Sequence, residues 1–215
     1  EIAKSSLFEC NLNQYNVIYL DITLFLSTLQ RDETLIKQIE REIIRDLGRV
    51  YSQVQDEENL IDALCAVNEI TGEKLILIID EWDAMFRECK GQDKILDSYI
   101  LLLRSLFKSS LTDQLFAGVY MTGILPIKKY GHESAVSDFY EYTMVDPRPL
   151  QEYIGFTEAE VKALCRKHHK EYMLMQQWYD GYFVGGIHVY NPKSVMESIL
   201  RNKFSNYWTK TETYE

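Results

Sequence analysis

Three short, unbroken apolar runs stand out along the first part of the chain. They cover residues 17–20, 75–79 and 115–121. None of them alternates apolar with polar residues. Continuous apolar runs of this length are typical of strands that are covered on both faces, which is the usual state of a parallel sheet. The pattern therefore predicts three strands of one parallel sheet.

Between these runs, apolar residues recur at the three- and four-residue spacing of an amphipathic helix. The three sets are Ile36, Ile39, Ile43 and Leu47; Leu60, Leu64 and Val67; and Tyr99, Leu102, Leu103 and Leu106. Strands that alternate with helices predict an α/β fold, with helices on both faces of the sheet. A fourth strand is expected at residues 140–145, before the Asp146-Pro147 break.

The pattern changes after Pro149. Thr157 and Glu160 have the spacing of a helix capping box. Asn191-Pro192 is typical of a second helix start, with Asn as the cap and Pro in the first turn. We therefore expect an α/β core over residues 1–150 and a small helical subdomain, built around a glycine-rich turn, over residues 151–215.

Composition and charge argue against some classes of function. The 215 residues include 33 acidic and 23 basic side chains, for a net charge of −10. This balance argues against broad wrapping of nucleic acid, which needs a basic face. No apolar run approaches the ~18 residues of a membrane span. The four cysteines form no C-x-x-C pair, so we expect reduced thiols in a cytoplasmic protein.

The candidate chemistry lies at the end of the second apolar run, where Asp80 and Glu81 follow residues 75–79. Ligands of open α/β sheets bind at the carboxyl ends of the strands. In P-loop NTPases an acid at this place helps to hold Mg²⁺. A carboxylate next to it can take the proton of the attacking water. The alternative is that both acids only end a strand and start a helix, and Asp83 is likewise either a helix cap or a site residue.

Thr122 follows the third apolar run. Its hydroxyl is placed either to sense the γ-phosphate or merely to form a turn before Gly123. The phosphate-binding motif G-x-x-x-x-G-K-S/T occurs nowhere in the sequence. Lys4-Ser5 resembles its last two residues but lacks the glycines. Without that cradle of backbone amides, we expect the chain by itself not to hydrolyse ATP.

Several stretches, in this order and at this spacing, match one family. They are residues 16–21, 78–83, 120–131, 155–157, 178–182 and 190–195, continued by 206–208 and 211–213. Over nearly its whole length, the chain resembles the bacterial AAA-ATPase-like family. Members of that family usually join an N-terminal P-loop ATPase domain to a PD-(D/E)XK nuclease-like domain.

The resemblance implies a three-layer, P-loop NTPase-like sandwich that uses ATP and Mg²⁺. Asp80 is then the Mg²⁺-side Walker B acid, acting through water, Glu81 the catalytic base and Thr122 the sensor. It also implies that the P-loop, with the first, central strand, precedes Glu1 and that the nuclease-like domain follows Glu215. A homo-oligomer or a protein partner is compatible with this family.

Two functions from different classes follow. The first is the ATP-hydrolysing core of a larger protein. The second is a non-hydrolysing, nucleotide-gated module that regulates the nuclease-like domain. The carboxylate of Glu81 favours the first, because a degenerate switch often loses it. A third idea, a metal-dependent nuclease built on Asp21, Asp80 and Asp83, is weak because no lysine follows at the spacing that such nucleases use.

Other residues keep two interpretations. Arg104 and Arg148 are either arginine fingers or surface residues. Residues 128–130, Lys-Lys-Tyr, either contact phosphate or nucleic acid or form a solvated loop. Residues 178–182 form either a packed corner of the helical subdomain or a surface for a partner.

Overall fold

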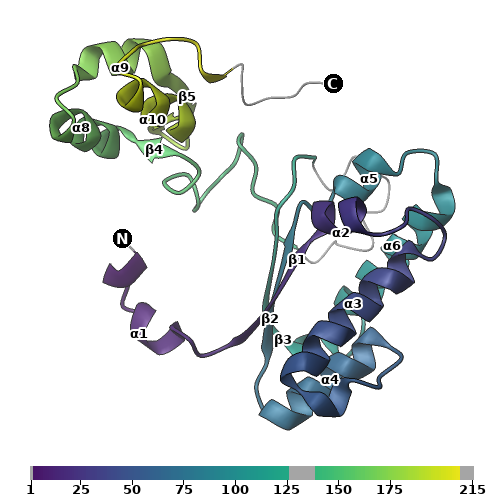
Figure 1. The fold of residues 1–215 in the computed structure, drawn as a ribbon. Coiled ribbons are helices and arrows are strands. Elements are labelled where there is room, and N and C mark those ends of the chain that lie inside the picture. The colour runs from purple at the N-terminus through teal and green to yellow at the C-terminus, as the bar shows by residue number, and fades with distance from the viewer. Residues whose placement is uncertain (1, 126–138, 209–215) are drawn as a thin grey trace. The chain divides into compact units, whose positions relative to one another are not determined.

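A computed structural model describes residues 2–125 and 139–208 (Figure 1). The chain divides into two compact units, Glu1–Phe139 and Tyr140–Glu215. This division lies earlier than the boundary expected near Leu150. Each unit has a hydrophobic core of its own, and we describe each by itself.

The first unit is built on a parallel sheet. Its strands are β1 (Asn16–Asp21), β2 (Leu75–Asp80) and β3 (Phe116–Met121), and they lie in the order β1-β2-β3. Both pairings are parallel. The prediction of three adjacent parallel strands is therefore confirmed. The register places Asp21 beside Asp80, and Ile79 beside Met121. Asp80 and Thr122 consequently leave the sheet at the same edge.

Three long helices follow the predicted periodicity. They are α3 (Leu35–Val50), α4 (Leu60–Thr71) and α6 (Asp93–Phe107). The shorter elements of the unit are η1 (Ile2–Lys4), α1 (Phe8–Asn11), α2 (Ile22–Thr28), η2 (Ser52–Val54), α5 (Ala84–Glu88) and α7 (Thr112–Leu115). Asn59 caps α4 through the amide of Ile61, at 2.8 Å. Gly72, with φ of 68°, ends the same helix in the left-handed conformation.

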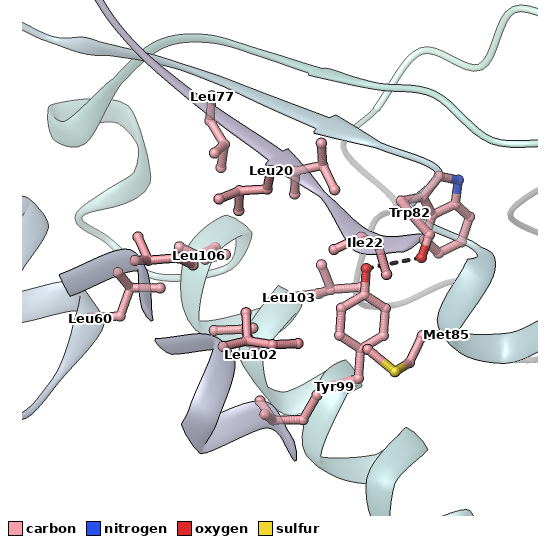
Figure 2. Close-up of a cluster of buried hydrophobic side chains, with 14 of the residues drawn as sticks. Leu20, Ile22, Leu60, Leu77, Trp82, Met85, Tyr99, Leu102, Leu103 and Leu106 are labelled. Atoms are coloured by element: carbon pink, nitrogen blue, oxygen red, sulfur yellow. Dashed lines mark hydrogen bonds between the residues drawn. The ribbon is translucent and has the colours of Figure 1, made fainter. Parts of the chain in front are cut away.

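The core of the first unit lies on one face of the sheet. Leu20, Leu75, Leu77 and Ile79 point into it and are at most 8% exposed. Figure 2 shows Leu20 and Leu77 with side chains from the helices, among them Leu60, Leu102, Leu103 and Leu106. The long helices α3, α4 and α6 lie together beside the sheet (Figure 1), and their buried residues belong to the same cluster.

The other face of the sheet is not covered by the described residues of this unit. Val17, Tyr19 and Tyr120 are each more than half exposed on it, and Ile76 and Ile78 are partly exposed. The expectation of helices on both faces, and with it a three-layer sandwich, is therefore wrong for the described part of this unit. An apolar run shows that a strand can be buried on both faces. It does not show whether the same stretch of chain supplies both covering layers.

The fourth strand expected at residues 140–145 does not form. These residues are bends and irregular structure, and the amides of Val145 and Asp146 bond to the Thr143 hydroxyl at 3.3 and 3.2 Å. Tyr140 is 89% exposed and Val145 94%. A strand was expected here, but the described residues offer no neighbouring strand with which it could pair.

The second unit combines helices with a small sheet. Its helices are α8 (Glu158–Lys167), α9 (Tyr172–Tyr179) and α10 (Pro192–Leu200), and its strands are β4 (Phe156–Thr157), β5 (Asp180–Val184) and β6 (Ile187–Tyr190). Both predicted helix starts are confirmed, since the Thr157–Glu160 capping box forms and Asn191 caps α10.

The helical, lid-like subdomain expected over residues 151–215 contains strands as well as helices. The strands form an antiparallel sheet in the order β4-β6-β5. Gly185 and Gly186, with φ of 58° and 89°, form the turn that closes the β5–β6 hairpin. Two consecutive residues with positive φ match the right-handed twist of a hairpin, so the glycine-rich turn joins two strands rather than two helices.

None of the helices in residues 2–125 and 139–208 combines the length and the apolar character that crossing a membrane would require.

Candidate functional site

Asp80, Glu81 and Thr122 meet at the carboxyl edge of the first unit's sheet. Asp80 is the last residue of β2, and Thr122 directly follows β3. The amide of Thr122 donates to the Ile79 carbonyl at 2.9 Å, which extends the pairing of the strands by one step. The Thr122 hydroxyl then donates a hydrogen bond to Oδ1 of Asp80. The three residues chosen from the sequence thus lie together.

The carboxylate of Asp80 is held from three directions. Its Oδ1 accepts from the Thr122 hydroxyl and from the Glu81 amide, the latter at 3.1 Å, and its Oδ2 accepts from the Tyr19 hydroxyl at 2.7 Å. The hydroxyls of Thr122 and Tyr19 hold the pKa of Asp80 below its usual value, because both donate to the charged form. Asp80 is therefore ionised at neutral pH.

Tyr19 was not predicted as a site residue. It lies on β1 opposite Ile78, and the exposed face of the sheet that carries Tyr19 and Ile78 also carries Asp80. Its bond to Asp80 raises the pKa of the Tyr19 hydroxyl, since the neutral form is the donor. The signal in the sequence was the position of Tyr19 two residues before the end of its strand, which matters only once the register of β1 and β2 is known.

Glu81 has an unusual backbone. Its φ of 52° lies in the left-handed region, which is uncommon for a residue other than glycine. The Glu81 amide faces both Asp80 Oδ1 and the Thr122 hydroxyl, at 3.1 and 3.3 Å. The Glu81 carboxylate does not bond to Asp80 or Thr122 but forms an ion pair with Arg87, in α5. Sequence reasoning did not select Arg87.

Asp83 is a structural residue rather than a solvent-facing ligand. Its side chain is fully buried and accepts from the amides of Ile124 and Leu125, at 3.2 and 3.1 Å, and from Arg87 Nε at 3.1 Å. It makes no side-chain capping bond to α5. Asp83 thus fastens the loop after β3 to the turn after β2.

Gly123 makes this close approach possible. A Cβ atom added at this residue would lie 2.6 Å from Asp83 Oδ1 and 2.8 Å from the Trp82 ring. Trp82 is itself fixed, because its amide donates to the Thr122 carbonyl at 2.9 Å and its carbonyl accepts from the buried Tyr99 hydroxyl at 2.9 Å (Figure 2). Only glycine fits here without moving one of its neighbours.

The three carboxylates of the nuclease hypothesis do not form one site. Asp21 caps α2 by accepting from the Leu24 amide at 3.0 Å and from the Thr23 hydroxyl at 2.5 Å. Asp83 is fully buried. In residues 2–125 and 139–208, no group of three or more His, Cys, Asp or Glu side chains could hold a metal ion.

Each remaining candidate has its own local surroundings. Arg104 is an exposed residue of α6. Arg148 belongs to the second unit and pairs with Asp146 at 3.3 Å. Tyr179 packs among the rings of Phe204, Tyr207 and Trp208, as a packed corner at residues 178–182 requires. Residues 128–130 lie outside the described part of the chain.

The donor set at the sheet edge suits a magnesium ion that is bound mainly through water. Asp80 supplies an ionised carboxylate and Thr122 a hydroxyl, and Mg²⁺ prefers oxygen ligands. Mg²⁺ usually keeps several waters and binds through one or two carboxylates together with the phosphates of a substrate. One carboxylate beside a hydroxyl therefore fits this ion, whereas it would not suffice for a metal held entirely by the protein.

Comparison with known proteins identifies a family for this chain. A family model described as "Predicted AAA-ATPase" matches residues 2–132, which is more than half of the chain and includes Asp80, Glu81 and Thr122. No curated protein and no solved structure matches the chain. The matched region contains the parallel sheet and the site at its carboxyl edge. The chain therefore belongs to the predicted AAA-ATPase family.

Proposed function

We propose that the carboxyl edge of the first unit's sheet is the Mg²⁺-dependent ATP site of an ATP-hydrolysing core. A general ATPase-like role follows from the family. The observation that carries the finer assignment is the contact between Thr122 and Asp80, with the Glu81 amide facing both side chains. Two neighbouring strands thereby bring an ionised carboxylate, a hydroxyl and a second carboxyl residue to one place.

Each residue has a distinct role in this proposal. Asp80, kept ionised by its hydroxyl donors, would hold the metal through water. Bound Mg²⁺ would neutralise charge on the phosphates. Glu81 would accept the proton of the water whose oxygen attacks the γ-phosphorus, while the bond from that phosphorus to the bridging oxygen of ADP breaks. The Thr122 hydroxyl would orient the water or the γ-phosphate.

The proposal requires a phosphate-binding loop that the 215 residues do not contain. We infer that residues outside this sequence supply it, and that a nuclease-like domain accompanies it. The chain alone should therefore bind nucleotide weakly and should not turn over ATP. Tight, Mg²⁺-dependent binding of ATP by the isolated chain would show that the site has been assigned wrongly.

One observation favours a second candidate, a nucleotide-gated module that does not hydrolyse ATP. The carboxylate of Glu81 is engaged by Arg87. A carboxylate oxygen that accepts from a guanidinium has fewer lone pairs left for the attacking water than a free one. If this ion pair persists when nucleotide binds, the site would switch conformation without hydrolysis.

The test compares Asp80→Asn and Glu81→Gln in the protein that carries the phosphate-binding loop. Asp80→Asn should weaken ATP binding only when Mg²⁺ is present. Glu81→Gln should keep binding and lose ~10²- to 10⁴-fold in single-turnover hydrolysis, the usual contribution of a general base. The exposed residues Asp97 and Glu58 provide matched controls, Asp97→Asn and Glu58→Gln.

The outcomes separate the two candidates. Hydrolysis at the parent rate by Glu81→Gln would make Glu81 a structural residue and would favour the nucleotide-gated module. If neither Asp80→Asn nor Glu81→Gln changed binding or hydrolysis, the carboxyl edge of β2 would not be the nucleotide site.

A further inference from the structure

The second unit carries a basic surface that the proposed ATP site does not use. Residues 166–170 read Arg-Lys-His-His-Lys, and residues 201–203 read Arg-Asn-Lys. These segments hold five of the nine Lys and Arg residues of Tyr140–Glu215, which also contains ten acidic residues. The first unit has 14 basic and 23 acidic residues. The negative charge of the chain therefore lies mostly in the first unit, and a local basic surface on the second is compatible with it.

The two segments form the ends of two helices, α8 and α10, and both helices end in the same way. The amide of the second residue past the helix cap donates to the carbonyl five residues earlier, from Lys170 to Cys165 at 2.8 Å and from Lys203 to Ser198 at 3.2 Å. This bond is typical of a Schellman motif. The ammonium group of Lys170 donates to Oδ1 of Asn202. Segments far apart in the sequence thus form one surface, residues 166–170 and 201–203, which we call the basic end.

The positive charges of the basic end are open to a partner. Arg166, Lys167 and Lys203 are exposed, and Lys170 is partly exposed. Within residues 139–208, the ion pairs with carboxylates involve other basic side chains than these four. Lys170 bonds to an uncharged amide, and only Arg201 is engaged by a carboxylate of α10. Four cations are therefore available to an anionic ligand.

The backbone at His169 gives a second indication. His169 follows the cap of α8 with φ of 53°, in the left-handed region. Glycine is the usual residue at this position, because it has no Cβ to strain the backbone. The ending of the helix does not require an imidazole there, and both His168 and His169 are exposed. Their rings add hydrogen-bonding nitrogen atoms and aromatic faces beside the four cations.

We propose that the basic end binds the sugar-phosphate backbone of a nucleic acid without reading its sequence. Arg and Lys side chains are common donors to phosphate oxygens. A protein partner fits less well, because protein interfaces have an apolar core and are depleted of Lys, whereas the basic end contains no apolar residue. This function is separate from the proposed ATP site, so either can fail without the other.

The test measures binding of the 215-residue chain to a labelled oligothymidylate and to a labelled DNA duplex, by fluorescence anisotropy at several salt concentrations. Four phosphate contacts predict a slope of log association constant against log salt of about −2.8 for the single strand and about −3.6 for the duplex. Between about 50 and 200 mM salt, affinity should therefore fall about 50-fold for the single strand and about 150-fold for the duplex. The arm with the higher affinity identifies the form of nucleic acid that the basic end prefers.

Variants locate the contact. Combining Arg166→Gln with Lys167→Gln should weaken single-strand binding about 25-fold at about 0.1 M salt and reduce the size of the slope by about 1.4, because each lost contact removes about 0.7. Lys203→Gln should weaken it about 5-fold from the other helix end. Lys193→Gln, at an exposed residue in the first turn of α10, is the matched control and should bind like the parent.

His169→Gly separates binding from folding. Glycine suits the positive φ, so this variant should be at least as stable as the parent in urea. It should nevertheless bind about 2- to 10-fold more weakly, the range for one hydrogen bond.

Four results would overturn the proposal. They are failure of the chain to bind either DNA, parent-like binding by the Arg166→Gln and Lys167→Gln double variant, equal weakening by Lys193→Gln, and tighter binding of labelled polyglutamate than of either DNA. The last result would identify an acidic protein as the partner.

Discussion

Asp83→Asn tests whether a buried carboxylate connects the ends of β2 and β3. Asp83 Oδ2 accepts from Leu125 and Arg87, and Oδ1 accepts from the Ile124 amide. An asparagine has the same shape but only one acceptor oxygen. In its best orientation it keeps the two bonds at Oδ2 and turns its amide group toward the N–H of Ile124.

The expected cost follows from these contacts. An unsatisfied buried amide costs about 1–3 kcal/mol. The bond from Arg87 also loses its charge assistance, which is worth about 1 kcal/mol more, the difference between charged and neutral hydrogen bonds. Asp83→Asn should therefore lower the free energy of unfolding of the first unit by about 2–4 kcal/mol.

The assay is equilibrium unfolding in urea, followed by tryptophan fluorescence. Trp82 is the tryptophan of the first unit, whereas Trp178 and Trp208 belong to the second. Replacing the latter two with phenylalanine leaves Trp82 as the reporter. This matters because a two-unit chain need not unfold in one transition.

Asp97→Asn, at an exposed residue of α6, is the control and should stay within about 0.5 kcal/mol of the parent. The slope of free energy against urea should not change, since the variants expose the same surface on unfolding. If Asp83→Asn were as stable as the Asp97→Asn control, the contacts of Asp83 with Ile124, Leu125 and Arg87 would not stabilise the connection between the two loops.

Two further variants test the site. Gly123→Ala should cost about 1–3 kcal/mol in the same urea assay, because its Cβ would lie 2.6 Å from Asp83 Oδ1; Gly118→Ala, whose Cβ would meet only Ile76 Cδ1 at 3.5 Å, should cost less. The hydroxyls of Thr122 and Tyr19 lower the pKa of Asp80, so Tyr19→Phe should raise that pKa, as measured by carboxyl NMR titration. The stability that Asp80 contributes is present above its unfolded pKa and is lost as the pH falls through its folded pKa, so this acid-sensitive contribution should shrink in the variant. An unchanged Asp80 titration would refute the role of Tyr19.

Local pattern determined most of the elements. The periodicity of Ile36, Ile39 and Ile43 specifies one face of a helix, and α3 buries those residues. The apolar run before Asp80 specifies a strand, and β2 ends at that residue. Short-range hydrogen bonding also determined the caps. The side chains of Thr157 and Glu160 each accept from the backbone amide of the other residue, three positions away.

The meeting of Asp80 with Thr122 could be expected because parallel neighbouring strands end at one edge. The other side chains that bond to the site residues could not be predicted from the sequence. Tyr19 reaches Asp80 only through the register of β1 against β2, and an apolar run does not specify that register. Arg87 was missed because its two bonds depend on the turn between β2 and α5, where Glu81 adopts a positive φ.

The tertiary structure decided which face of the sheet is covered and which segments pair as strands. The sequence marked Val17 and Ile78 as apolar, but an apolar residue is compatible with a buried face and with an exposed one. Residues 140–145 have the composition of a strand, yet a strand exists only where a neighbour pairs with its backbone groups. Gly185 and Gly186 specified a turn, and the antiparallel partners on either side made it a hairpin. The sequence by itself thus determined the features that depend on neighbours a few residues away. The tertiary structure decided those that depend on contacts between distant residues, because such contacts are set by register, coverage and burial.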